Sequence, residues 1–405
     1  MSTAILPSTA SDDKSLINLD AFAVQPRPYQ QRIIQRALDA FGCSAACDAA
    51  FEPTACTEAT ENGAGQGGQS KSRPSSVLIE SPTGSGKTVM GLAVAAIMQR
   101  TLGIQVGWVA MRRNLLIQAQ AENARREFGV DMRMISMFDK NPPSVNLLVV
   151  DEAQHDAATS MANLHGQIQP QWTLGLSATP YRSDRIKLCF ENVIRDAGIA
   201  HLIADGYLSP YHHYTIEEYS PETVATLLIE EPERWGKSLV FFHKQTQCDE
   251  LKSRLDAAGI RSDIVTAKTD RERQLARFVE GQTDVLINMA ILTEGFDCPS
   301  LKTVFCRPSG QGTTIQMAGR VLRQCESEPV KQVVQCRHTR HPMMRTAIPA
   351  EQYLWTEYGW RSISGNRQLD AMAMAARQRV AKANVSLPKL IAAHRPRRRM
   401  HRLTR

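Results

Sequence analysis

The chain has 405 residues, of which 42% are hydrophobic and 22% are charged, and its formal net charge is +7. This length allows two to three domains, and the composition is that of an ordinary globular protein. The sequence contains no run of eighteen apolar residues, so we expect no transmembrane helix.

The cysteines and the N-terminal residues bear on the compartment. Nine cysteines are scattered without the even spacing of a disulfide framework, and the first twenty residues lack the pattern of a secretory signal. We therefore expect reduced thiols, a cytoplasmic location and no association with a membrane.

The positive charge is concentrated at the C-terminal end. Ten Lys or Arg and no acidic residue follow Asp370, so the rest of the chain is near −3 (+7 − 10). Such a tail predicts non-specific, salt-sensitive affinity for the phosphate backbone of nucleic acid. A solvated end without a partner is the alternative.

The first part of the chain has three segments of different character. Residues 1–24 are predicted to be a flexible arm. In the stretch RPYQQRIIQRALDAFG, 27–42, the apolar residues share one face of a helix that Gly42 can end. Residues 43–76 are rich in Gly, Ser and Ala, which predicts a flexible insertion. Its cysteines are candidate metal ligands that lack a fourth partner nearby: Cys43, Cys47 and Cys56.

Short apolar runs typical of strands then alternate with helical patterns. They cover 77–80, 106–111, 132–138, 146–152 and 173–179, and later 238–243, 262–267, 284–290, 302–307 and 333–338. The alternation predicts an α/β fold of parallel sheets with helices on both faces. Residues 206–224 interrupt it and are predicted to be a connection. We expect two tandem lobes over 25–205 and 206–345, then an aromatic segment and basic tail over 346–405.

The stretch SPTGSGKT, 81–88, lies between a predicted strand and a predicted helix. Gly84 and Gly86 would let backbone N–H groups curl around phosphates, with Lys87 on the β- and γ-phosphates and Thr88 on Mg²⁺. Ser81 stands where the strict pattern has Gly. The alternative is an unrelated glycine-rich turn.

A second apolar run, LLVVDEAQ, ends in two acids. Unpaired charges at the edge of a core are costly, and Mg²⁺ would account for them. Asp151 would hold the metal, and Glu152 would orient or deprotonate the attacking water. Ordinary surface acids after a strand are the alternative.

Near the end of the globular part, the chain reads QMAGRVLR, 316–323. Helical spacing would place Gln316, Arg320 and Arg323 on one face, and Gly319 would let another group approach closely. This arrangement predicts an anion-binding site. A solvated basic helix face is the alternative.

These motifs occur together in an order that resembles the superfamily-two helicases of the DEAD/DEAH-box type, and within them the RadD-like and restriction-subunit-like branch. The motifs cover residues 27–323: RPYQ, SPTGSGKT, AMRRNLLIQ, DEAQ, SATP, LVFFH, ILTEGFDCPSL and QMAGRVLR. The resemblance implies two RecA-like lobes with ATP and Mg²⁺ between them.

The resemblance also implies roles for matching positions. Arg27 and Gln30 would read adenine, and Arg320 would be an arginine finger with Arg323 and Gln316 beside it, so the anion would be the γ-phosphate. The phosphate-binding set would be Ser81, Pro82, Thr83, Gly84, Ser85, Gly86, Lys87 and Thr88, with Thr88 and Asp151 on Mg²⁺. Gly295 and Asp297 would line the second lobe's side of the cleft. Gln154, Ser177 and Thr179 would couple the nucleotide state to the grip on nucleic acid.

Two stretches depart from the family pattern. Gln154 stands where relatives have His or Asp, and ISMFDKNPPSVN replaces an element that contacts the strand in relatives. The sequence therefore predicts an ATP-dependent helicase or translocase, with DNA favoured over RNA as partner. The alternatives are an RNA helicase or remodeller, a non-catalytic nucleic-acid clamp, and a P-loop kinase or transporter ATPase.

Two side-chain groups near the end of the globular part have an open interpretation. The aromatic residues of 351–363 would either stack on bases or pack a small hairpin onto the second lobe, which we favour: Tyr353, Trp355, Tyr358 and Trp360. Four further residues would either bind a metal or serve structure, as buried strand cysteines commonly do: Cys325, Cys336, His338 and His341.

Overall fold

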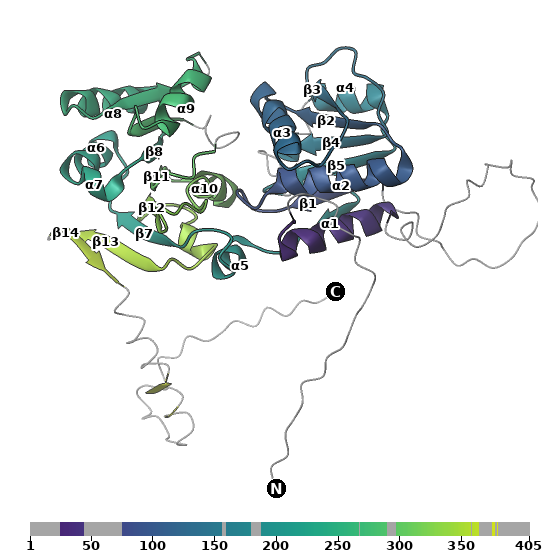
Figure 1. Cartoon of the computed structure of the whole chain (residues 1–405). Helices are drawn as coiled ribbons and strands as arrows, with labels where there is room; N and C mark the ends of the chain where they lie inside the picture. The colour runs from purple at the N-terminus through teal and green to yellow at the C-terminus, as the bar shows by residue number, and fades with distance from the viewer. Residues whose placement is uncertain are drawn as a thin grey trace, which may run out of the picture.

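The computed structural model describes residues 25–43, 75–155, 159–179, 188–266, 268–289, 297–357 and 359–363, together with 375, 376 and 379 (Figure 1). The predicted arm and almost all of the predicted insertion and of the basic tail lie outside these residues. The described chain forms two α/β lobes, each built on its own sheet, which confirms the predicted fold class.

The first lobe carries a six-stranded sheet. Its strands are β1 (Ser76–Glu80), β2 (Val106–Ala110), β3 (Met132–Ser136), β4 (Leu147–Asp151), β5 (Trp172–Ser177) and β6 (Asn192–Ile194). Its helices are α1 (Pro28–Phe41), α2 (Lys87–Leu102), α3 (Arg113–Arg125), η3 (Ala153–His155) and α4 (Thr159–Ile168), and α5 (Ile199–Ala204) leads towards the second lobe.

The second lobe carries an eight-stranded sheet. Its strands are β7 (Tyr211–Ile216), β8 (Ser238–Phe241), β9 (Ser262–Val265), β10 (Val285–Asn288), β11 (Thr303–Cys306), β12 (Lys331–Cys336), β13 (Glu351–Thr356) and β14 (Gly359–Ser362). Its helices are α6 (Pro221–Glu230), α7 (Pro232–Trp235), α8 (Gln245–Ala257), α9 (Arg271–Val279), α10 (Gln311–Ala318) and η5 (Met343–Arg345).

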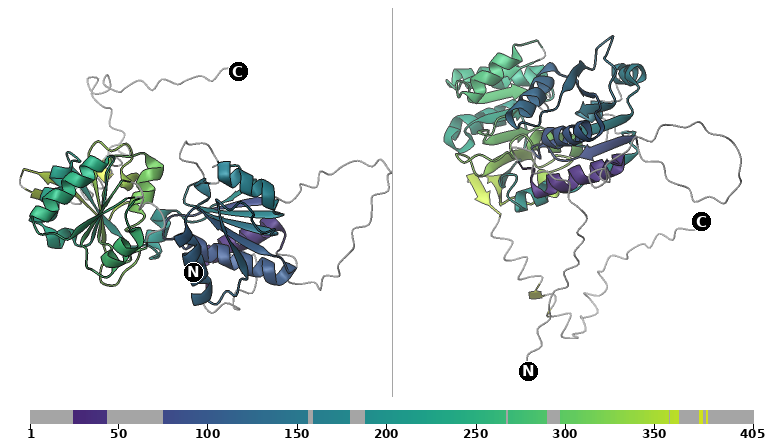
Figure 2. Two further views of the ribbon diagram at one scale, coloured as in Figure 1. Left: turned by 90° about the horizontal axis from the view of Figure 1, so that it is seen from above. Right: turned by 45° about the vertical axis from the view of Figure 1, so that its right-hand side comes forward.

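Strand order brings the predicted motifs to one edge of each sheet. The first sheet runs β3-β2-β4-β5-β1-β6 with every pairing parallel, so the loops after β1, β4 and β5 meet at its carboxyl edge. In the second sheet, β14-β13-β7-β12-β11-β8-β10-β9, only the β13–β14 pairing is antiparallel. Figure 2 shows both sheets between layers of helices.

Helix α2 is buried in the first lobe. Eleven of its residues are buried, because it packs between α1 and α3 over the first sheet (Figure 1). A helix that is apolar all round is buried on all sides, and the sequence VMGLAVAAIM supplies that surface. The packing fixes the start of α2, where the glycine-rich loop ends.

The predicted connection over 206–224 is wrong. It contains β7, a strand of the second sheet that pairs in parallel with β12 and β13, and the start of α6. The polar letters of YHHYTI hide this strand. His213 is only 2% exposed, and its Nε2 lies 3.1 Å from Gln335 Oε1 on β12.

The predicted helix through both arginines of QMAGRVLR is also wrong. α10 ends at Ala318, Gly319 is its C-cap, and the chain continues in turns. Arg320 and Arg323 therefore project from a loop, which we call the arginine loop (319–323).

The hairpin of β13 and β14 extends the second sheet beyond residue 345. Tyr353 stacks on Tyr214 of β7 with ring centroids 4.7 Å apart, and Trp360 packs edge-on to Tyr214 at 4.9 Å. The Trp360 indole N–H donates to Glu231 over 2.9 Å. These contacts confirm the predicted packing of the hairpin onto the second lobe; Tyr358 lies outside the described residues.

Candidate active site

The glycine-rich loop after β1 has the conformation that a phosphate-binding loop needs. Gly84 and Gly86 have φ values of +84° and +80°, which residues with a Cβ adopt only with strain. A Cβ on Gly86 would lie 2.5 Å from Gln30 Nε2. The loop is therefore closely packed against the start of α1.

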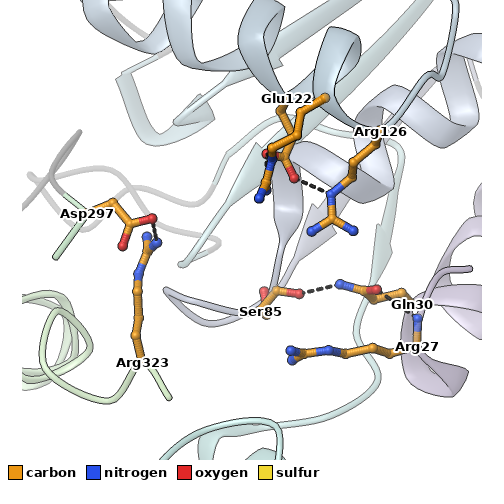
Figure 3. Close-up of polar contacts among 8 residues, drawn as sticks. Arg27, Gln30, Ser85, Glu122, Arg126, Asp297 and Arg323 are labelled. Atoms are coloured by element: carbon orange, nitrogen blue, oxygen red, sulfur yellow. Dashed lines mark hydrogen bonds and ion pairs between the residues drawn. The ribbon is translucent and has the colours of Figure 1, made fainter. Parts of the chain in front are cut away.

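The side chains at the start of α1 hold this loop. Gln30 Nε2 and the Tyr29 hydroxyl both donate to the Ser85 carbonyl, over 2.8 and 2.6 Å. Arg27 lies over the Tyr207 ring, 4.9 Å from its centroid, and donates to the Tyr207 carbonyl. The predicted adenine-reading pair, Arg27 and Gln30, is thereby positioned beside the loop (Figure 3).

Lys87 begins α2 at the end of the loop. Its side chain is 9% exposed, and Nζ lies 3.5 Å from the Pro82 carbonyl. Burial lowers the pKa of Lys87, while the carboxylates of Glu152 and Asp151 oppose that effect. A bound phosphate would favour the charged ammonium further.

A chain of hydrogen bonds joins the acids after β4 to the end of β5. The Gln154 amide N–H donates to Glu152 over 2.8 Å, and the Ser177 hydroxyl is 2.6 Å from Gln154 Oε1. Ser177 also bonds to the carbonyl and N–H of Thr179. Glu152 has a φ of +54°, an uncommon conformation that functional sites often contain. The three predicted coupling residues therefore form one network with Glu152.

The arginine loop of the second lobe lies against the glycine-rich loop of the first. A Cβ on Gly319 would meet Thr83 Cβ at 3.0 Å, and a Cβ on Gly84 would lie 3.7 Å from Arg323 Cγ. Gly319 thus permits the close approach that the sequence predicts. Arg320 is 6% exposed, and Arg323 forms an ion pair with Asp297 (Figure 3).

These elements enclose one cavity of about 730 Å³. Predicted residues from both lobes line it: Arg27, Gln30, Thr83, Gly84, Ser85, Gly86, Lys87, Thr88, Asp151, Glu152, Asp297, Arg320 and Arg323. Ser81, Pro82 and Gln316 are not in its lining, and Gly295 lies outside the described residues. A cavity of this size, with phosphate-binding and acidic groups converging on it, can hold a nucleoside triphosphate.

Two sequence profiles match the chain. Residues 23–141 match the res subunit of type III restriction enzymes, and residues 220–325 match the helicase conserved C-terminal domain. The chain belongs to the superfamily-two helicases of the restriction-subunit-like type. This membership confirms the family resemblance carried by the ordered motifs.

Relatives of this helicase include viral and yeast proteins. A 51.5 kDa protein of a Lactococcus phage is 25% identical over 269 residues, which are 57% of this chain and 59% of the phage protein. IRC3 of Saccharomyces cerevisiae, which bears the name of an ATP-dependent helicase, is 28% identical over 233 residues, 47% of this chain and 34% of its own. The helicase thus spans less than two thirds of the length of these relatives.

Solved structures share its fold. The ATP-dependent Type ISP restriction–modification enzyme LlaBIII bound to DNA has a TM-score of 0.51 at 14% identity, over 78% of this chain and 28% of that one. Mss116p bound to single-stranded RNA and AMP-PNP has a TM-score of 0.50 at 16% identity, over 71% and 72%. At this identity the likeness concerns the two-lobed RecA-like fold alone.

The helicase has donors suited to a magnesium ion in its cavity. Asp151 and Thr88 both line it, and Asp151 is only 7% exposed. Carboxylate, hydroxyl and phosphate oxygens are the ligands that Mg²⁺ prefers. The residues present therefore fit the metal that the family implies.

A second cavity of about 450 Å³ lies in the second lobe, at the carboxyl ends of β8 and β11. Its lining is rich in basic side chains: His243, Arg307, Pro308, Ser309, Gly310, Thr313, His338 and Arg340. Burial, together with the charge of Arg307, lowers the pKa of His243. This cavity shares no lining residue with the first one, and its basic groups suit phosphate groups.

The other candidate metal ligands of the sequence do not come together as a metal site where they are described. Cys336 is 6% exposed in the core of the second lobe, and Cys325 and Cys336 are free thiols. Among the described residues, no three His, Cys, Asp or Glu side chains are arranged to hold a metal. Cys43 is buried at the end of α1, whereas Cys47 and Cys56 lie outside the described residues.

Sequence reasoning missed one wall of the main cavity. Six residues of α3 and its C-cap line it: Leu115, Gln118, Ala121, Glu122, Arg125 and Arg126. Their helical spacing on one face was visible in the sequence, but nothing there indicated what that face would meet.

In the described part of the helicase, no helix is long and apolar enough to cross a bilayer.

Proposed function

We propose that this helicase hydrolyses ATP with Mg²⁺ in the cleft between its lobes and uses the cycle to move along nucleic acid, with DNA as the favoured track. One observation carries the proposal. Lys87 and Glu152 of the first lobe line the same cavity as Arg320 of the second. A binding clamp has no need of a buried lysine, a strained acid and an arginine brought together from two lobes.

The residues of the first lobe would bind ATP with Mg²⁺ and activate the attacking water. The N–H groups of the glycine-rich loop and Lys87 would hold the phosphates, and Thr88 and Asp151 would hold Mg²⁺, which neutralises charge on the phosphate oxygens. Glu152, fixed by Gln154, would orient the attacking water or take its proton.

The residues of the second lobe would complete the site. Arg320 and Arg323 would stabilise charge on the transferred phosphoryl group, a contribution worth roughly 10³–10⁵ in rate in P-loop enzymes. Because they come from the other lobe, ATP would favour the state in which the lobes approach, and hydrolysis would remove that preference. In this structure Arg323 is paired with Asp297 in a partly exposed ion pair, which would cost little to break if the phosphate took its place.

Nucleic acid would be held mainly through its backbone. The basic cavity of the second lobe supports this, since arginine and histidine contacts to phosphate position a strand without reading its sequence. DNA is favoured because the res-subunit profile matches the first lobe and LlaBIII, of the same fold, is bound to DNA. Mss116p, bound to RNA, keeps RNA as the second candidate. A cytoplasmic location is part of the proposal, since the described cysteines are free.

The test is ATP hydrolysis with single-stranded DNA, duplex DNA, branched DNA or RNA. Lys87→Ala should abolish hydrolysis, and Arg320→Ala should lower it by about 10³-fold. Arg133→Ala, an exposed residue of β3, is the matched surface control and should behave as wild type. Stimulation by RNA alone would replace DNA by RNA, and tight binding of nucleic acid without hydrolysis would replace the motor by a clamp.

A further inference from the structure

The missed wall of the nucleotide cavity is formed by one face of α3. Leu115, Gln118, Glu122, Arg125 and Arg126 are spaced so that they project from the same side of the helix, and all five line the cavity. α3 therefore forms one side of the cavity.

Arg126 is the best positioned cation on this wall. Its Nε donates to Glu122 Oε1, and Arg125 Nη2 lies 2.5 Å from Glu122 Oε2. The side chains differ in exposure: 25% for Arg126, 19% for Glu122 and 68% for Arg125. Glu122 thus holds a largely covered guanidinium at the cavity while Arg125 extends into solvent.

The direction of Arg126 indicates which part of a nucleotide it would meet. In Figure 3 its guanidinium points across the cavity towards Gln30, with Arg27 on the far side of Gln30 and Arg323 at the opposite end. Arg323 belongs to the phosphate end, whereas Gln30 belongs to the end expected to receive the base. Arg126 therefore lies at the base end.

The remaining groups at this end suit a flat aromatic ring. Gln30 uses one amide N–H on the Ser85 carbonyl and one lone pair on the Arg27 N–H, so each end of its amide retains capacity for the edge of a base. Arg27 stacks one face on Tyr207 and can offer the other. A second planar cation across from it would complete a sandwich, and guanidinium planes stack well on bases.

We propose that Arg126, positioned by Glu122, contacts the nucleobase and forms the second wall of the base pocket, opposite Arg27. The ligand is the purine ring of the nucleoside triphosphate, so the inference rests on the proposed function. A guanidinium held along its Nε edge keeps its face and its terminal amino groups for the ring.

The test compares ADP with pyrophosphate, which shares the phosphates but lacks the base. This titration does not require the two lobes to close, because Gln30, Arg126 and the glycine-rich loop all belong to the first lobe. Titration calorimetry at constant Mg²⁺ should show that Arg126→Ala raises the Kd for ADP by about 5- to 30-fold. The Kd for pyrophosphate should change less than about twofold, and this binding also shows that the variant is folded.

Two further variants separate base contact from simple charge. Arg126→Lys keeps the charge but loses the plane, so it should lose nearly as much ADP affinity as Arg126→Ala. Arg133→Ala, which removes an exposed arginine elsewhere on the lobe, should leave both ligands unaffected.

Several results would overturn the inference. Equal losses for ADP and pyrophosphate in Arg126→Ala would assign Arg126 to the phosphates, and recovery of ADP affinity in Arg126→Lys would assign it a purely electrostatic role. Unchanged ADP binding in Arg126→Ala would remove it from the pocket while leaving the proposed function intact. Wild-type protein that binds neither ligand would instead overturn the proposed function itself.

Discussion

Ser177→Ala tests whether the hydrogen-bond network behind Glu152 supports hydrolysis. Ser177 is fully buried and Gln154 is 7% exposed, and their hydrogen bond measures 2.6 Å. Removing the hydroxyl takes one donor from a buried amide oxygen, a loss worth about 1–3 kcal/mol. Gln154 would then hold the Glu152 carboxylate less firmly.

The expected loss appears in two measurements. The free energy of unfolding in urea should fall by about 1–3 kcal/mol, and the rate at saturating ATP with nucleic acid should fall by roughly 5- to 150-fold if that energy is expressed at Glu152. The double variant with Gln154→Ala should show non-additive losses, since the two residues share one network.

Ser238→Ala is the matched control for this prediction. Ser238 is also fully buried, and its hydroxyl bonds to the Gly236 carbonyl over 3.0 Å in the second lobe, away from the cleft. It should lose stability but not hydrolysis. If Ser177→Ala loses stability alone, as Ser238→Ala does, the network has no role in the reaction and the reasoning is refuted.

Three other changes follow from single contacts. Gly86→Ala, at φ +80° and 2.5 Å from Gln30 Nε2, should weaken ADP binding by about 5- to 30-fold in calorimetry; unaltered binding would show that the loop adapts. Lys331→Met should lower the free energy of unfolding by about 2–4 kcal/mol, because the buried Lys331 Nζ donates to the Pro299 and Leu301 carbonyls over 2.6 and 2.8 Å. The half-exposed Lys302 is the control, and Lys302→Met should leave the free energy of unfolding nearly unchanged. Burial lowers the pKa of His213, so the unfolded chain binds its proton first and stability falls as the pH drops below about 6.5. In His213→Gln, the midpoint of urea unfolding should fall less between pH 7 and pH 5 than in the wild type. An equal fall in both proteins would show that His213 is not the source of the pH dependence.

The strands of the two sheets were largely readable from the sequence, because parallel strands buried on both faces are continuous apolar runs. β7 was not readable, since its histidine is satisfied by Gln335 on a strand more than a hundred residues later. Local periodicity carries no information about such a partner.

The candidate site was also predicted in part, where local motifs mark its residues, and missed where only packing places them. The glycine-rich loop, the acids after β4 and both arginines were predicted from local motifs, and the structure gathers them in one cavity. The helix expected to carry the arginines ends at Ala318, because spacing alone does not show where a helix stops. Arg126 had no motif at all, and its position depends on how α3 packs beside α2. The predicted domain limits stay predictions.

The contact between Gly319 and Thr83 gives the two lobes a hard stop. A Cβ at residue 319 would lie 3.0 Å from the Thr83 Cβ of the first lobe and 2.7 Å from the Ile315 carbonyl of its own helix, so the backbone at Gly319 lies directly against the Thr83 side chain. The approach of the arginine loop to the glycine-rich loop is limited at this point by the backbone of Gly319. In the proposed cycle, a methyl group added at residue 319 would hold the arginine loop farther from the glycine-rich loop, and so would limit how closely the two lobes can approach each other.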